Sequence, residues 1–194
     1  MRTELSDFVV SKISPILKSD DESYVRASLA KLRRGIGKHP GRTPDIGEFI
    51  LWKMPEKFRS TTDGPTEAEW AVHIAMTLFA LHQQGKDPQD NPMSVIGKPL
   101  GWAVRMLVVR QGKQAEQPIK RRFDTVVTSD SIEELAHHLR GIIQLLRSKG
   151  IPLDYPQLAE DLYQFQNPEY RDNMRLRWLR DYYRIGKDEE NDEQ

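Results

Sequence analysis

The chain contains no cysteine among its 194 residues. Disulfide bonds, thiol catalysis and cysteine-ligated zinc are therefore excluded. The sequence also lacks any apolar run that approaches the roughly 18 residues needed to span a membrane. Its first ten residues, MRTELSDFVV, are interrupted by acids, and their apolar run is too short for a signal peptide. These absences favour an intracellular, cytoplasmic protein with no membrane partner.

Signs of catalysis are also lacking. The five histidines form no HExxH pair, and the glycines around Lys38 lack the spacing of a phosphate-binding P-loop. Glu133 and His137 stand four residues apart, as do Glu134 and His138, and this helical spacing suits pairing on a surface. A metal-dependent enzyme built on these pairs is the less favoured alternative. We expect no enzyme, no bound metal and no cofactor.

A nearly continuous apolar segment lies near the middle of the chain. Within residues 71–81 only His73 and Thr77 are polar. A helix that is apolar on all sides has to be surrounded by other helices, and we interpret His73 as a hydrogen-bonded core residue. The motif Asp63-Gly64-Pro65 supplies a start signal for this helix.

Apolar residues at helical spacing predict further helices, and no alternating pattern competes with them. Ser19-Asp20-Asp21-Glu22 and Ser131-Ile132-Glu133-Glu134 read as capping boxes, and Ser94 is a further cap candidate. Tyr24 is expected on the buried side of the helix that follows the first box. The sequence predicts an all-α protein of about eight to nine helices in two small bundles. The expected helices cover residues 3–18, 22–34, 46–52, 65–83, 94–110, 116–127, 132–149, 155–166 and 168 onward.

The domain organisation follows from breaks in these helices. We predict an N-terminal bundle over residues 1–112, a C-terminal bundle over residues 113–187 and an acidic, disordered tail over residues 188–194. Gly112 marks the boundary between the bundles, and the polar loop at residues 83–92 is the alternative position.

Positive charge is concentrated in two segments although the formal net charge is zero. Five of the 29 acids lie in the tail, which leaves 24 acids against 29 cations, a net charge of +5 for the rest. Residues 26–42 contain six cations and no acid, and residues 95–122 contain seven cations and one acid. Such a distribution favours an anionic partner.

A purely structural role explains the positive charge of the first segment more readily than that of the second. Arg33 and Arg34 end a helix, where cations also stabilise the helix dipole, and then a Gly/Pro loop follows. Lys120-Arg121-Arg122 lies inside a helix, where three adjacent like charges need acidic partners or an anionic ligand. Guanidinium groups bind phosphate through two hydrogen bonds. For Lys120-Arg121-Arg122 we favour an anionic ligand, and Arg140 on the next helix is a candidate to extend the same surface.

Aromatic side chains offer a second way to bind nucleic acid, by stacking on bases. At helical spacing they are more often core residues, and we assign them to the core. Trp52 and Tyr183 are the exceptions. The assigned core residues are Trp70, Trp102, Tyr155, Trp178 and Tyr182.

Several short sequence strings are weakly specific alone, but the whole set in this order along the chain is specific. They are Leu32-Arg33-Arg34-Gly35, Phe79-Ala80-Leu81-His82, Arg121-Arg122-Phe123, Leu139-Arg140, Leu145-Leu146-Arg147, Gly150-Ile151-Pro152-Leu153-Asp154-Tyr155 and Arg177-Trp178-Leu179-Arg180-Asp181-Tyr182-Tyr183. In these strings the chain resembles the CasB small subunit family of the type I-E CRISPR Cascade complex. The resemblance covers roughly residues 24 to 185.

The resemblance implies a non-catalytic helical subunit that stabilises the R-loop, meaning the displaced non-target DNA strand and the duplex of crRNA with target DNA. It implies as partners the crRNA, both DNA strands, the backbone and large subunits of Cascade, and a second copy arranged head to tail. It also implies nucleic-acid contacts by Arg33, Arg34, Arg121, Arg122 and Arg140. From charge alone we add Lys31, Lys38, Arg42, Lys98, Arg105 and Lys120.

The alternative is a helical scaffold without direct nucleic-acid contact, whose cations pair with acidic surfaces of other subunits. The two hypotheses differ in salt dependence, because each phosphate that a cation neutralises releases counterions.

Overall fold

The computed structural model describes residues 3–189, with side chains described up to residue 184. This part of the chain is all-α, as predicted, and contains nine α-helices. Three single-turn 3-10 helices, at Pro44–Ile46, Glu56–Phe58 and Lys113–Ala115, lie between them. The α-helices are α1 (Glu4–Leu17), α2 (Glu22–Arg33), α3 (Gly47–Ile50), α4 (Glu67–Gln83), α5 (Leu100–Gln111), α6 (Glu116–Val127), α7 (Ile132–Lys149), α8 (Tyr155–Phe165) and α9 (Pro168–Glu189).

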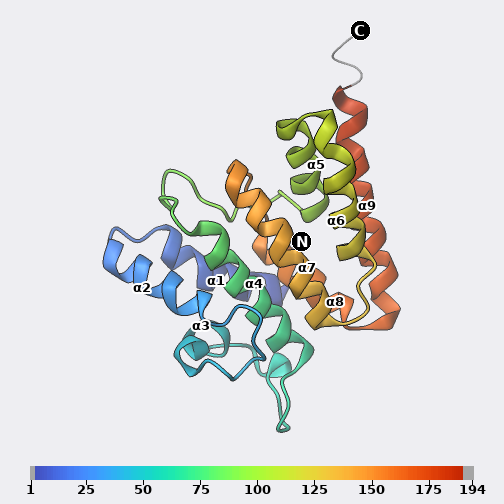
Figure 1. Ribbon diagram of the computed structural model, residues 1–194. Helices are drawn as coiled ribbons and strands as arrows, with labels where there is room; N and C mark the ends of the chain where they lie inside the picture. The colour runs from blue at the N-terminus through green and yellow to red at the C-terminus, as the bar shows by residue number, and fades with distance from the viewer. Residues whose placement is uncertain (1–2, 190–194) are drawn as a thin grey trace.

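The apolar helix α4 lies at the centre of one group of helices, as its composition predicts. It packs against α1, α2, α7 and α8 (Figure 1), and nearly all of its residues are buried. On the right of Figure 1, α5, α6 and α9 form a second group, in which α5 packs along α9. The helices α7 and α8 contact both groups.

The buried residues of both groups belong to one continuous hydrophobic cluster. The N-terminal helices α1 and α4 contact α8, from the predicted C-terminal bundle, while α5 contacts α9. The division into bundles at residue 112 stays a prediction. The first two residues of the predicted tail, 188 and 189, are the last two of α9, and its residues 190–194 lie outside the described part. Within the described residues, no helix is both long and apolar enough to cross a membrane.

The start of α4 differs from the expected one. Thr66, rather than Asp63, caps the helix in a capping box with Glu69. The backbone N–H of Glu69 donates to Thr66 Oγ1 at 3.1 Å, and the Thr66 N–H donates to Glu69 Oε2 at 2.9 Å. This reciprocal pair satisfies two backbone donors of the first turn, and so it outcompetes the start signal at Pro65.

The prediction of a helix from Ser94 is wrong, because α5 begins at Leu100. The preceding segment pairs with the residues before α8: Val95 N–H donates to Leu153 O at 3.0 Å, and Asp154 N–H donates to Lys98 O at 2.8 Å. Gly97 adopts a positive φ of 81°, which does not belong to a right-handed helix. Pro99 then occupies the N-cap of α5.

The start of α2 needs a smaller correction. The capping side chain is Asp21, which accepts hydrogen bonds from the N–H groups of Ser23 and Tyr24. Tyr24 is 42% exposed rather than buried. Val25, Leu29 and Leu32 form the buried face of α2.

Candidate nucleic-acid interface

The turn that follows α2 is fixed by a buried histidine on α4. His73 Nε2 lies 2.9 Å from the Gly35 carbonyl oxygen and donates to it. Burial lowers the pKa of His73, and the hydrogen bond to Gly35 only partly offsets this effect, so the ring is neutral. A Cβ on Gly35 would lie 2.6 Å from Ile46 Cδ1 and 2.9 Å from Thr77 Cγ2. The predicted core role of His73 is thus confirmed, and it fixes the backbone that presents Arg33 and Arg34.

Three of the predicted cations come together between this turn and α7. Lys38, Arg42 and Arg140 all line one cavity of about 370 Å³, between residues 36–42, α4 and the first half of α7. Lys38 and Arg42 are exposed, as is Arg140. The described part of the chain places no carboxylate within ion-pair distance of these three side chains.

A second pair of cations lies where α2 ends. Partial burial lowers the pKa of Arg33, and the nearby positive charge of Arg147 on α7 lowers it further. Two like charges held near one another are unfavourable without an anion between them. Arg147 donates from Nη1 to Gln84 Oε1 at 3.2 Å. Arg147 is absent from the predicted set, yet it stands seven residues after Arg140 and therefore on the same helix face.

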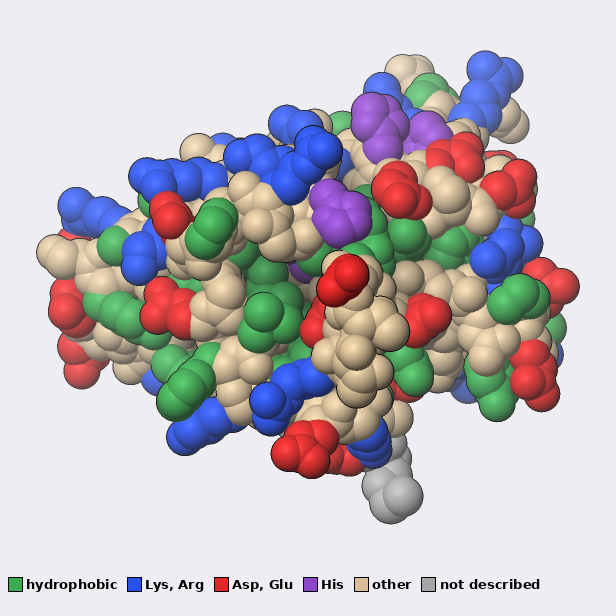
Figure 2. Space-filling model, turned by 90° about the horizontal axis from the view of Figure 1, so that it is seen from below, with side chains coloured by type: hydrophobic (Ala, Val, Ile, Leu, Met, Phe, Trp, Pro, Cys, Tyr) green, Lys and Arg blue, Asp and Glu red, His purple; other side chains and the backbone are tan. Residues whose placement is uncertain are grey.

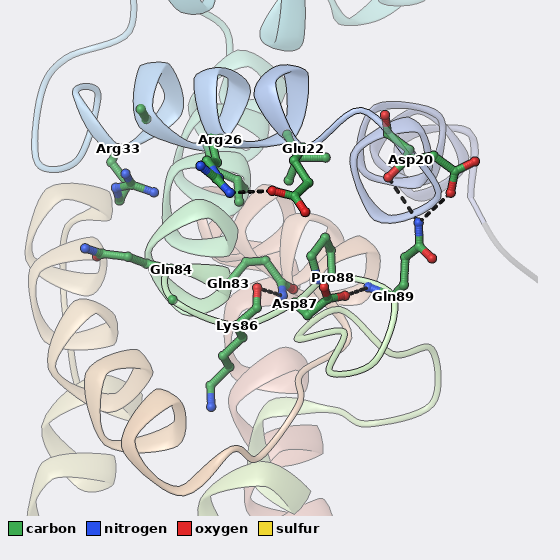
Figure 3. Close-up of a pocket in the computed structure, with 15 residues that line it drawn as sticks. Asp20, Glu22, Arg26, Arg33, Gln83, Gln84, Lys86, Asp87, Pro88 and Gln89 are labelled. Carbon is green, nitrogen blue, oxygen red and sulfur yellow. Dashed lines mark hydrogen bonds and ion pairs between the residues drawn. The ribbon is translucent and has the colours of Figure 1, made fainter.

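Arg33 also borders an open groove between α2 and the loop after α4 (Figure 3). Gln84 and Lys86 of that loop lie across from it. The loop is closed by the side chain of Gln83, whose Nε2 donates to the carbonyl oxygens of Lys86 and Asn91 at 3.2 and 3.1 Å.

These residues define a surface that we call the α7 basic strip. Figure 2 shows Lys and Arg side chains gathered on one side of the face seen from below, with histidine side chains next to them. The strip runs beside α7, with two members on that helix and three on α2 and the turn after it. Its members are Arg33, Lys38, Arg42, Arg140 and Arg147.

Other predicted cations have partners within the protein. Lys31 pairs with Glu48, and Arg34 with Asp45, both at exposed positions. On α5 and α6, Arg105 pairs with Glu116 and Lys120 with Asp124, while the ammonium of Lys98 lies 4.2 Å from the centre of the Trp102 ring. Exposed pairs are weak and can open to an anion. For Lys120 the structure thus supplies an acidic partner, the alternative to an anionic ligand for the Lys120-Arg121-Arg122 run.

Arg121 and Arg122 remain exposed on α6, and neither forms an ion pair with the described residues. With Lys120, whose ammonium lies 5.9 Å from the centre of the 58% exposed Tyr183 ring, they form a second cationic site.

The aromatic assignments are largely confirmed. Tyr155, Trp178 and Tyr182 are buried, and the two exceptions, Trp52 and Tyr183, are exposed at 66% and 58%. Trp70 and Trp102 are partly buried against the core.

One of the two Glu/His pairs, Glu134 with His138, has the expected surface geometry. His138 Nε2 lies 3.7 Å from Glu134 Oε1, and the His137 and His138 rings meet edge to face. Within the described residues, no group of three or more potential ligands is arranged to hold a metal ion.

Comparison with protein families gives a decisive match. Residues 28–183 match the family model of the CRISPR-associated protein Cse2. The chain belongs to the Cse2 family. The matched segment contains every residue of the α7 basic strip as well as Arg121 and Arg122.

Solved structures agree with this assignment. The crystal structure of CasB from Thermobifida fusca is 32% identical in sequence at a TM-score of 0.76, and the match covers 94% of this chain and 99% of that one. A CRISPR-associated protein of the Cse2 family from Thermus thermophilus is 22% identical at a TM-score of 0.67, over 93% and 98% of the two chains. A chain of a CRISPR RNA-guided surveillance complex is 19% identical at a TM-score of 0.73, over 98% of each. The last two show a shared fold. No relative is found among curated proteins.

Proposed function

We propose that this Cse2-family protein is a non-catalytic small subunit of a type I-E Cascade surveillance complex and that it binds nucleic acid through the α7 basic strip. The observation that supports this best is the set of cations without carboxylate partners. Arg33, Lys38, Arg42 and Arg140 are left uncompensated by the described residues, and Arg147 adds a fifth charge beside Arg33.

The chemistry of the strip suits a phosphate backbone. Phosphate contacts position a protein on nucleic acid but convey no sequence information, and a subunit that works with any guide needs such contacts. R-loop formation exchanges one duplex for another of similar stability, so that contacts to the backbone can shift the balance. In our proposal the protein holds the displaced non-target strand and the duplex of crRNA with target DNA.

The same proposal includes the protein partners. The subunit would contact the backbone and large subunits and a second copy of itself in head-to-tail order, in a complex that acts in the cytoplasm. The surveillance complex that contains a chain of the same fold supports this assembly. Arg121 and Arg122 on α6 are proposed as a second contact to nucleic acid, since they too have no ion-pair partner among the described residues.

The scaffold alternative stays open for the paired cations. Lys31, Arg34 and Lys120 already have carboxylate partners on this chain, and acidic side chains of another subunit could replace those partners. This alternative predicts association with other subunits and no binding of free oligonucleotide.

The test is fluorescence anisotropy of a labelled single strand with the full-length protein across a salt series. If the five cations of the α7 basic strip each contact a phosphate, log K falls with log salt at a slope near −0.7 × 5, or about −3.5. The test variant changes Arg33, Lys38, Arg42 and Arg140 to Gln. The matched control changes four exposed lysines elsewhere, Lys18, Lys53, Lys57 and Lys113, to Gln, so that both variants lose the same net charge.

We expect the strip variant to lose most of the affinity and most of the salt slope, and the control to keep the slope. Circular dichroism shows whether both variants are folded. Equal losses in the two variants would mean that binding depends on net charge alone, and the absence of binding by the wild type would favour the scaffold hypothesis.

A further inference from the structure

The cavity between α4 and α7 has a composition that phosphate binding alone does not require. Besides Lys38, Arg42 and Arg140, its lining includes the Trp70 ring and apolar groups of Ile74 and Ala136. Its volume of about 370 Å³ lies at the lower end of the 300–1,000 Å³ typical of small-molecule pockets. The cavity therefore combines a cationic mouth with an apolar and aromatic interior.

The interior of the cavity is uncharged. Trp70 is held edge to face by His39, with ring centroids 5.0 Å apart and an interplanar angle of 76°. His73 lines the inner end, and burial lowers its pKa so that it stays neutral. The positive charge of the cavity thus lies at the exposed cations, and Glu133 is the acidic residue of its lining.

We propose that this cavity receives one unpaired nucleotide of the bound strand. The base lies against Trp70 and the apolar wall, and the flanking phosphates lie at Lys38, Arg42 and Arg140. Glu133 can accept a hydrogen bond from an exocyclic amino group, as carboxylates do from cytosine N4. This inference rests on the proposed function, and it adds a contact to a base where that function needs only contacts to phosphates.

A nucleotide fits the cavity better than an acidic peptide does. Carboxylate side chains would satisfy the cations but would leave the aromatic and apolar interior without a partner. Every base has a face that stacks on an aromatic ring, and such stacking is tolerant of sequence. A subunit that serves any guide could therefore use this pocket without restricting the guide.

The experiment compares two labelled strands of equal length, one ordinary and one fully abasic, which has the same phosphates and no bases. Each is made as RNA and as DNA, so that the source of the nucleotide can be distinguished. The protein is the full-length wild type at fixed salt. Because stacking contributes about 1–3 kcal/mol per base, the ordinary strand should bind about fivefold or more tightly than the abasic strand.

Two variants locate this preference. Ala136→Phe places a ring in the cavity and leaves all its cations, so we expect the two strands to bind it equally. Gln144→Phe adds the same side chain at an exposed position two turns further along α7, and we expect it to keep the wild-type preference. Circular dichroism and a melting curve report whether each variant is folded.

The outcomes separate this inference from the proposed function. Equal binding of both strands by the wild type, with a steep salt slope, overturns the nucleotide pocket and leaves the phosphate contacts in place. A preference that persists in folded Ala136→Phe overturns it as well. Competition by a poly-glutamate peptide that is lost in Ala136→Phe would assign the cavity to a protein partner instead. If neither strand binds the wild type, both proposals fail.

Discussion

His82 on α4 and Tyr155 at the start of α8 form a buried hydrogen-bonded pair 73 residues apart in sequence. The His82 Nδ1–H donates to the Tyr155 hydroxyl at 3.0 Å, and that hydroxyl donates to the Leu78 carbonyl oxygen at 3.1 Å. Both side chains are fully buried. The pair therefore connects the central helix to the segment that follows α7.

Removing the Tyr155 hydroxyl should destabilise the protein. Tyr155→Phe keeps the ring and leaves the buried Nδ1–H of His82 without an acceptor, which costs about 1–3 kcal/mol in the free energy of unfolding. Urea denaturation measures this loss. Tyr183→Phe, at an exposed ring, is the control and should change stability by less than about 0.5 kcal/mol. Equal effects at the two positions would show that the buried hydrogen bond is not the cause.

Acid should weaken the fold through His82. Burial lowers the pKa of His82 to about 3, whereas the unfolded chain titrates near 6.5. Below about pH 6.5 the unfolded chain takes up a proton that the folded protein does not, so stability falls as the pH falls and levels off near the folded pKa. The slope from this one group is at most about 1.4 kcal/mol per pH unit.

The matched variant is His82→Asn, which keeps an N–H donor near the Nδ1 position and does not titrate. Urea midpoints between pH 7 and pH 4 should fall less steeply for His82→Asn than for the wild type. Identical slopes would mean that other groups, such as the buried His73, account for the acid sensitivity.

The same substitution, glycine to alanine, should have opposite effects on stability at two glycines that lie in helices. Gly101 of α5 lies against α9, and a Cβ there would be 2.1 Å from the Trp178 carbonyl oxygen and 2.7 Å from the Tyr182 nitrogen. Both are backbone atoms, which cannot move aside, so Gly101→Ala should cost about 3 kcal/mol or more. A Cβ on Gly141 of α7 would meet no atom within 4 Å, and Gly141→Ala should stabilise by about 0.5–1 kcal/mol.

Thermal melting of the two variants checks both signs in one experiment. A mild effect of Gly101→Ala would mean that α5 and α9 can separate without loss of the remaining core. Because α5 meets α9 through this glycine, the result also tests how firmly the second group of helices, on the right of Figure 1, is held together.

The sequence predicted helices best where local signals decide their limits. The limits of α6 agree with the expected residues 116–127, and Ser131 caps α7 by accepting from the Glu134 N–H at 3.1 Å. The second half of that capping box differs, since Glu134 accepts from the Asp130 N–H instead. The late start of α5 was not predictable locally, because residues 93–98 hydrogen-bond to residues that lie 56 to 60 positions further along the chain.

Residues in several of the strings that resemble the CasB family make buried contacts within the fold. Gly35 meets His73, His82 meets Tyr155, and Trp178 donates to the buried carboxylate of Asp161 at 2.6 Å. Composition alone gives no sign of these pairs, because each joins distant segments. The strings therefore identify the fold more directly than they identify the surface that binds a partner.

The candidate interface was also only partly predictable from the sequence. Charge density identified Lys38 and Arg42, the family resemblance implied Arg140, and the fold brings the three together. Arg147 was missed because a single cation near a helix end resembles a dipole contact, although its spacing of seven from Arg140 was a usable signal. The ion pairs of Lys31 and Arg34 depend on tertiary contacts with residues 45–48, which no local pattern reveals.

The difference between paired and unpaired cations leads to a graded prediction for binding. Lys38, Arg42 and Arg140 have no carboxylate partner among the described residues, so each can bind a phosphate without first breaking an ion pair. Changing all three to Gln should reduce the salt slope for single-stranded nucleic acid by about 0.7 per lost contact, or about 2.

The matched variant changes Lys31, Arg34 and Lys120 to Gln, which removes the same net charge. These cations have to leave Glu48, Asp45 and Asp124 before they can bind an anion, and exposed pairs of this kind contribute up to about 1 kcal/mol each. We expect their loss to change the slope by less than half as much. Anisotropy titrations of both variants at four salt concentrations give the two slopes. A larger effect of the paired set would place the bound strand nearer to α3 and α6 than to the α7 basic strip, because the paired carboxylates lie on those helices and the turn before α3.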